Sequence, residues 1–354
     1  MPKRVRHDER NEMGSGAQGP SRRRQNSLKI DKVKLAAVLI TAAGLAVTIG
    51  LLAMVGFGDV LGAVKRIGFA GFLIYSSYTL VILSVLGLAW YCVAPGLGRE
   101  WLWAFIWGRT TREAATDVLP FSQFGGIVVG ARSVIVSGVR PPLVYASLVA
   151  DQTTELAAQL VYTLYGVGAL ALILSSTPTS GDLLTLAGTG LAVSIAIMVA
   201  FTVLQRPLLV FAGRIAGAIL PGSDTAMLNI RDELDDIYRR KPQVIASFLL
   251  HICTWVGSGA GAWIALNFIG VEISVGKVII IESLIFTLRT AAFLVPGAIG
   301  LQEGAYLLLA PLFGLPAEAA LALSLLKRAR DLAIGIPVMI IWQVNEGRGA
   351  IKTG

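Results

Sequence analysis

Long runs of apolar residues alternate with short polar segments along most of this 354-residue chain. A helix needs about 20 apolar residues to cross a hydrocarbon core of about 30 Å. Six runs meet this requirement and are predicted to be membrane-spanning helices: residues 35–55, 69–93, 143–174, 183–204, 244–269 and 317–342. The predicted fold class is therefore an all-α polytopic membrane protein, with residues 35–342 as one transmembrane domain.

Two further apolar stretches, residues 101–138 and 277–314, contain charges and a proline-glycine break. Pro120 and Pro296 each remove a backbone donor and disfavour helical geometry in the preceding residue. A broken backbone at membrane depth must be enclosed by protein or by a water-filled cavity. Both stretches are therefore predicted to be re-entrant helical hairpins that enter and leave on one side. The alternative, two full spans in each stretch, raises the count from six helices to ten.

Basic residues predict which ends of the spans face the cytoplasm. Ten of the 30 Lys and Arg residues lie before residue 35, so residues 1–34 are expected to be a disordered cytoplasmic tail drawn to anionic headgroups. Loops predicted on the same side are rich in cations, as the positive-inside rule requires. Only Lys65 and Arg66, in the first outer loop, do not follow this rule. The chain end, residues 343–354, is expected on that side too. The cytoplasmic loop 205–242 is expected to contain an amphipathic helix, because Ile230, Leu234, Ile237 and Tyr238 recur at helical spacing.

Composition narrows the function classes. Only 15% of residues are charged, against about 25% in soluble domains, and mean hydropathy is +0.71. The net charge of +8 comes mostly from the tail, where no aromatic residue is interleaved, so a nucleic-acid partner is not expected. Two cysteines and two histidines offer no metal site, cofactor site or Cys/His nucleophile. Cys92, Cys253 and His251 are expected to be packing residues, and the late first apolar run argues against a cleaved signal peptide.

The two broken stretches belong to a weak internal repeat. At an offset of 176 residues Pro120 aligns with Pro296, and residues 155–157 align with residues 331–333. Three predicted spans separate the hairpins, so the units at roughly 101–174 and 277–342 have opposite orientations. Inverted repeats with broken helices allow a midplane site to open to either side.

Charges inside the predicted membrane domain are the candidate functional residues. Each costs about 2.5–3.5 kcal/mol at the centre of a span, yet the last span contains Lys327, Arg328, Arg330 and Asp331. Lys327, Arg330 and Asp331 share a helix face. Two or three of the cations are therefore expected to converge on one anionic group, with Asp331 holding them in position. The other candidate charges are Arg112, Glu113, Asp117, Asp151, Glu155, Arg289 and Glu303. The alternative is a structural ion-pair network that fastens the hairpins.

The breaks offer backbone groups as well. A half-helix that begins after Pro120 or Pro296 presents free N–H groups suited to an anionic headgroup, and Gln123 and Gln302 add donors. The alternative role of the nearby glycines is to allow close helix packing.

Three motifs carry a resemblance to a known family. These are residues 119–126 (LPFSQFGG), 295–304 (VPGAIGLQEG) and 326–332 (LKRARDL). They resemble the flippase-like family of lysylphosphatidylglycerol synthase transmembrane regions, and most of all its hopanoid-biosynthesis-associated bacterial members. The resemblance implies that these positions form the lipid or headgroup pathway: Pro120, Gln123, Gly125, Gly126, Pro296, Gly300, Gln302, Glu303, Lys327, Arg328, Arg330 and Asp331.

The expected function is a multi-pass lipid flippase or transporter of the bacterial inner membrane, with hopanoid or an anionic lipid as cargo. No nucleotide motif is present, so transport is expected to be passive or ion-coupled, with Asp151, Glu155 or Glu303 as proton carriers. The transferase domain of aminoacylating relatives is not found before Gly354, so lipid synthesis is not expected. The alternatives are a headgroup transferase with Glu303 or Asp331 as general base, and a scaffold that recruits lipid-biosynthesis enzymes through the tail.

Overall fold

The computed structural model describes residues 65–118, 122–174, 223–291 and 300–353, with isolated positions at 62 and between 185 and 203. In these residues the regular structure is helical and no strand occurs, which confirms the all-α prediction. The elements are α3 (Gly68–Cys92), η1 (Arg99–Trp101), α4 (Leu102–Val118), α5 (Ser122–Val136), α6 (Pro141–Leu174), α8 (Ser223–Arg239), α9 (Lys241–Ile269), α10 (Val275–Ala291), α11 (Leu301–Leu309), η3 (Ala310–Phe313) and α12 (Ala317–Thr353).

Three predicted spans coincide with helices that are long and apolar enough to cross a membrane, namely α3, α6 and α9. α12 covers the last predicted span but continues to Thr353, through the segment expected to be a tail. The predicted spans at 35–55 and 183–204 lie outside the continuously described residues. The count of six and the orientation in the membrane therefore stay predictions.

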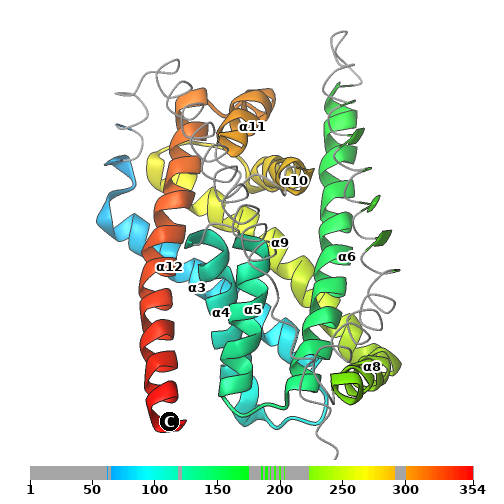
Figure 1. Cartoon of the computed structure of the whole chain (residues 1–354). Helices are drawn as coiled ribbons and strands as arrows, with labels where there is room; N and C mark the ends of the chain where they lie inside the picture. The colour runs from blue at the N-terminus through cyan, green and yellow to red at the C-terminus, as the bar shows by residue number, and fades with distance from the viewer. Residues whose placement is uncertain are drawn as a thin grey trace, which may run out of the picture.

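The two broken stretches each form a pair of helices in contact. α4 and α5 lie side by side in the lower half of Figure 1, whereas α10 and α11 lie at its upper end. The breaks themselves, residues 119–121 and 292–299 with Pro120 and Pro296, lie outside the described residues. The hairpins thus occupy opposite ends of the molecule.

Glycines set the close packing of α4 on α5. A Cβ at Gly126 would meet the Thr116 hydroxyl and the Arg112 carbonyl, and one at Gly130 would lie 2.9 Å from the Gly108 carbonyl oxygen. Gly125, by contrast, faces open space. Gly126 therefore has the alternative role considered above, because it allows α5 to pack closely against α4 in the first hairpin.

The larger apolar clusters lie towards opposite ends. The upper one joins α3, α9, α10, α11 and α12, and the lower one joins α3 to α6 with α8. α8 confirms the expected amphipathic helix, but Ile230, Leu234 and Ile237 are buried against α6 and its neighbours rather than left for lipid. Tyr238 donates a hydrogen bond to Thr153 Oγ1 at 3.0 Å.

The outer surface of the spans is apolar. α3 exposes Leu73, Leu80 and Val81, and α9 exposes Ile245 and Leu249. Large apolar areas of this kind need a partner or a bilayer to cover them. Buried charge inside and exposed aliphatic side chains outside are what a protein solvated by lipid requires.

Candidate functional site

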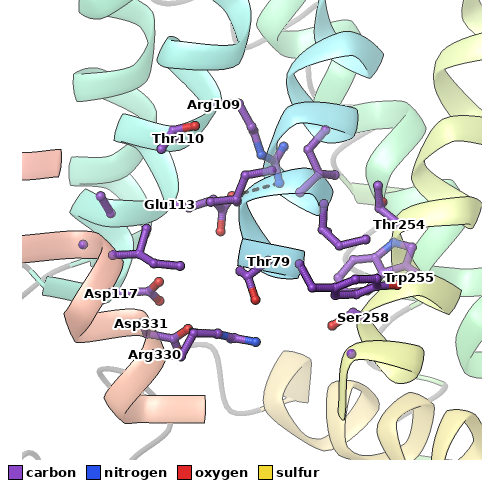
Figure 2. Close-up of a pocket in the computed structure, with 18 of the residues that line it drawn as sticks. Thr79, Arg109, Thr110, Glu113, Asp117, Thr254, Trp255, Ser258, Arg330 and Asp331 are labelled. Carbon is purple, nitrogen blue, oxygen red and sulfur yellow. Dashed lines mark hydrogen bonds and ion pairs between the residues drawn. The ribbon is translucent and has the colours of Figure 1, made fainter. Parts of the chain in front are cut away.

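A cavity of about 180 Å³ lies in the middle of the molecule, between α3, α4, α6, α9, α10 and α12. Its α3 wall follows one helix face, because positions 75, 78, 79, 82, 83 and 86 recur at intervals of three and four. Figure 2 shows the α4 side chains on one side and Thr254, Trp255 and Ser258 of α9 on the other. The cavity is lined by acids (Glu113, Asp117, Glu155, Asp331), arginines (Arg109, Arg289, Arg330) and aromatic residues (Tyr75, Tyr78, Trp255, Phe286).

A group of charges begins in the cavity wall and continues between α4, α6 and α9. We call it the first cluster, and it consists of Arg109, Arg112, Glu113, Asp151, Glu155 and His251. Arg109 Nη2 lies 2.8 Å from Glu113 Oε1 and 2.6 Å from Glu155 Oε1, and Arg109 Nη1 lies 3.4 Å from Asp151 Oδ2. Arg112 Nη2 lies 3.2 Å from Glu155 Oε2. These bonds connect α4 to α6 with carboxylates that are shared between two arginines.

On the α10 and α11 side lies the second cluster: Glu282, Gln302, Glu303, Tyr306, Ser324, Lys327 and Arg328. Lys327 Nζ lies 2.5 Å from Glu282 Oε2, and Tyr306 donates to the other Glu282 oxygen. Arg328 Nε lies 2.8 Å from Glu303 Oε1. These contacts fix α10 and α11 to α12.

The remaining charges of the cavity lie on α12 and near the ends of α4 and α10. Arg330 donates to Asp331 Oδ1 at 2.5 Å and to the Tyr75 hydroxyl at 2.7 Å, and its guanidinium lies 5.0 Å from the centre of the Tyr75 ring. Asp117 on α4 and Arg289 on α10 line the same cavity, and neither makes an ion pair with any described residue. In Figure 2 Asp117, Arg330 and Asp331 lie close together. A carboxyl group and a guanidinium, each without an ion-pair partner in the described part of the chain, thus face the cavity.

The structure places the sequence-predicted residues in three groups. Glu113, Asp117, Glu155, Arg289, Arg330 and Asp331 line the cavity. Arg112 and Asp151 lie behind it in the first cluster, and Gln302, Glu303, Lys327 and Arg328 form the second cluster away from it. Gln123 lies in the first turn of α5.

The expected convergence of the α12 cations on one group is wrong. Lys327, Arg328 and Arg330 pair with Glu282, Glu303 and Asp331 respectively. Their side chains are long enough to reach acids on different helices, so a shared helix face does not bring the charges together.

The break before α11 is also less open than expected. Gly300 has φ +81° and donates its backbone N–H to Glu303 Oε2 at 2.8 Å. The carboxylate of Glu303, in the first turn of α11, thus accepts a hydrogen bond from an N–H group that was predicted to bind a headgroup.

The expectation that His251 is a plain packing residue is wrong. Its side chain is fully buried, as expected, but Nε2 lies 2.9 Å from Asp151 Oδ1. Cys92 and Cys253 have free thiols.

Sequence reasoning missed the α3 and α9 walls. Tyr75, Tyr78 and Thr79 fall within an apolar run, so the run was interpreted only as a span. Their spacing at i, i+3 and i+4 is the signal that marks a polar stripe on α3. Arg109 is absent from the candidate charges predicted above, although its side chain is only 2% exposed. No three His, Cys, Asp or Glu residues of the described ranges form a group suited to a metal ion.

Fold and cavity together define a helical membrane protein with a charged internal cavity. Residues 35–338 match the family described as the lysylphosphatidylglycerol synthase TM region, and the chain belongs to this family. The resemblance seen in the motifs is thereby confirmed at the family level. No curated protein and no solved structure matches the chain.

Proposed function

We propose that this protein moves a lipid across the bacterial cytoplasmic membrane, with the lipid headgroup passing through the central cavity. The observation that carries the proposal is the contrast between a cavity lined by seven charged residues and an exterior of exposed aliphatic side chains. The family's description also connects it to lipid handling.

The cavity fits a headgroup better than a whole lipid. Ligand pockets commonly have volumes of roughly 300–1,000 Å³, and this one has about 180 Å³. Taking a polar headgroup out of water is costly unless the protein replaces its hydrogen bonds. Asp117, Arg289 and the hydroxyls of Thr79 and Ser258 supply such bonds, while the acyl or polycyclic part stays in the bilayer.

The arrangement of the hairpins supports alternating exposure of the cavity. The first cluster connects α4 to α6, and the second connects α10 and α11 to α12. Each hairpin therefore has its own anchor, and the cavity lies between the two anchored units. Rocking of one unit against the other would open the cavity to either side.

The end drawn lowest in Figure 1 is proposed to be cytoplasmic. It holds the start of α9 with Arg240 and Lys241, and the C-terminal end of α12. Arg99 and Arg140 lie at the helix starts of this end and are exposed. A concentration of cations on one side follows the positive-inside rule.

The proposed cargo is a hopanoid or a related glycolipid or phospholipid. The hopanoid assignment rests on the three motifs at 119–126, 295–304 and 326–332. A hydroxylated headgroup suits this cavity, since carboxylates and guanidiniums accept and donate hydrogen bonds and Trp255 and Phe286 offer aromatic surface.

The transferase alternative depends on a general base that reaches the cavity. Glu303 is fully buried and is bonded to Arg328, Ser324 and the Gly300 N–H, so it does not line the cavity. Asp331 lines it, but shares its Oδ1 with Arg330. The scaffold alternative involves residues 1–34, which lie outside the described residues.

Reconstitution tests the proposal. The purified protein in liposomes is expected to move an acyl-labelled fluorescent phospholipid or a labelled hopanoid between leaflets faster than empty liposomes do. Asp117→Asn and Arg289→Gln should slow this movement, while Arg140→Ala, a change to an exposed surface pair, should not. A rate equal to that of empty liposomes with every cargo would refute the proposal. Loss of one lipid species from a deletion strain, without redistribution of any other, would favour the transferase.

A further inference from the structure

His251 is the buried centre of the contact between α6 and α9. Its side chain has no exposed area, and Nε2 lies 2.9 Å from Asp151 Oδ1. The other ring nitrogen, Nδ1, is buried and has no hydrogen-bond partner among the described residues. A buried nitrogen without a partner costs free energy and therefore needs an explanation. With a proton on Nε2 that is donated to Asp151, Nδ1 carries a lone pair that can accept one more proton.

The charges around His251 leave room for that proton. α6 contributes Asp151 and Glu155, and α4 contributes Arg109, Arg112 and Glu113. With a neutral imidazole the first cluster therefore holds three carboxylates and two guanidiniums, an excess of one negative charge. One proton on His251 balances it. The second cluster is already balanced, with Glu282 and Glu303 against Lys327 and Arg328.

The other helices packed against α9 bring no further charge to this point. α3 contains no Asp, Glu, Lys or Arg, and its Cys92 thiol is close enough to interact electrostatically with Asp151. The α10 and α12 charges Arg289, Arg330 and Asp331 line the cavity, and the α8 acids Glu233 and Asp236 pair with Arg140 and Arg240 outside it.

Polar side chains lie one turn from His251 and Asp151 in two directions, and two pockets lie further along these helices. Glu155, one turn from Asp151 on α6, lines the central cavity together with Thr254, one turn after His251 on α9. In the other direction Thr154 Oγ1 and Ser247 Oγ are buried and 2.9 Å apart, one turn from Asp151 and His251. The start of α9 then opens into a separate pocket lined by Arg240, Gln243 and Ala246.

We propose that His251, paired with Asp151, is the proton-binding site that couples lipid movement to a proton gradient. A hydronium ion gives its proton to the Nδ1 lone pair and becomes water, and the imidazolium later gives this proton to a water molecule on the opposite side and returns to its neutral form. The imidazolium strengthens its hold on Asp151, whose second oxygen contacts Arg109 at 3.4 Å and Arg112 at 3.5 Å. Because Arg109 also lines the cavity, a change in its bonds reaches the site of the headgroup. The coupling rests on the proposed transport function.

The proton site can be tested without any transport measurement. The chain has two histidines, His7 and His251, so His7→Gln leaves a single imidazole. Nitrogen-15 NMR of histidine-labelled protein in lipid nanodiscs should show that His251 takes up a proton reversibly when the sample is acidified. Asp151→Asn should alter this proton uptake. An imidazole that keeps one protonation state at every pH at which the protein stays folded would overturn the proton site.

The coupling is tested in proteoliposomes with an imposed pH gradient. The wild-type rate of fluorescent phospholipid movement should change several-fold with the gradient. His251→Gln, whose amide still donates to Asp151 but takes up no proton, should keep lipid movement and lose the gradient response. Cys253→Ala, a change on the exposed face of α9 two residues from His251, should retain the response.

Each other outcome has a distinct meaning. A wild-type rate that ignores the gradient, or a gradient response that survives in His251→Gln, overturns the coupling and leaves the proposed transport standing. Titration of His251 without any lipid movement by the wild-type protein overturns both the proposed function and the coupling.

Discussion

Buried ion pairs attach each hairpin to a neighbouring helix, and the hairpin contributes mainly the cations in the first cluster but the acids in the second. In the first cluster the cations lie on α4 and the acids lie mostly on α6, so Arg109 contacts three carboxylates. In the second cluster the acids lie on α10 and α11 and the cations lie on α12, with Lys327 on Glu282 and Arg328 on Glu303. Shared charges allow partners to be exchanged, whereas separate pairs hold one geometry.

The positions of the clusters relative to the cavity agree with this difference. Glu113 and Glu155 of the first cluster line the cavity, and their side chains are 30% and 13% exposed. Glu282 and Glu303 of the second cluster are 0% exposed. We infer that the first cluster takes part in the transport cycle and that the second cluster holds the second hairpin in place.

Arg109→Met should have the largest effect on stability. It leaves Glu113, Asp151 and Glu155 with one guanidinium fewer. Breaking a buried ion pair costs about 3–5 kcal/mol, and we expect a loss at the upper end, measured by unfolding in detergent. Arg140→Ala, whose side chain is 70% exposed beside Glu233, should cost only about 0–1 kcal/mol. Similar losses in the two variants would contradict the buried network.

Lys327→Met should cost about 3 kcal/mol, because Glu282 is left buried without its cation. Adding Glu282→Gln should recover most of this loss, since no other charged group of the described residues forms an ion pair with either member. The same treatment of the first cluster, Arg109→Met with Glu155→Gln, should recover little, because two other carboxylates remain. Equal recovery in both double-mutant cycles would remove the distinction between shared and separate charges.

Asp117→Asn and Arg289→Gln should change transport and leave stability within about 0.5 kcal/mol. Neither residue makes an ion pair with the described residues, so the fold loses no ion pair. The change at Arg289 removes a guanidinium that lies 5.6 Å from the centre of the Phe286 ring. Leaflet movement of labelled lipid and the melting temperature of the same preparation give the two readouts. A large fall in melting temperature with unchanged transport would place these residues in the structure instead of the pathway.

Adjacent glycines of α5 offer the smallest and most local comparison. Gly126→Ala should cost about 1–3 kcal/mol, because the added methyl meets Thr116 and the Arg112 carbonyl. Gly125→Ala has open space, so it should be neutral or stabilising by about 0.5–1 kcal/mol. The measurement is the difference between the two unfolding free energies. A reversed order would mean that α4 and α5 are not packed as described.

The spans were predictable because their signal is a long apolar run. The predicted boundaries 69–93, 143–174 and 244–269 lie within a few residues of α3, α6 and α9. The apolar face of α8 was predictable for a similar reason, since its apolar residues recur with a clear helical period. The partner of this face was not predictable, because an apolar helix face has the same sequence pattern whether protein or lipid lies against it.

Pairing of the charges could not be predicted to the same extent. The motifs located Glu303 just after a break and Arg328 in the last span, but their mutual bond depends on the rotation of α11 against α12. His251 and Asp151 are one hundred residues apart, and nothing in their spacing joins them. The α3 stripe was accessible in principle, because Tyr75, Tyr78 and Thr79 repeat with the helical period.

The central claim, that a lipid headgroup occupies the cavity, is tested most directly by photolabelling. A phospholipid with a photoreactive headgroup is incorporated with the protein into nanodiscs, and the labelled residues are identified by mass spectrometry. We expect labels on the cavity stripe of α3, at Tyr78, Thr79 and Ile82, and on Trp255. Headgroup labels confined to the exposed α3 positions Leu73, Leu80 and Val81, with none on the stripe, would contradict the claim.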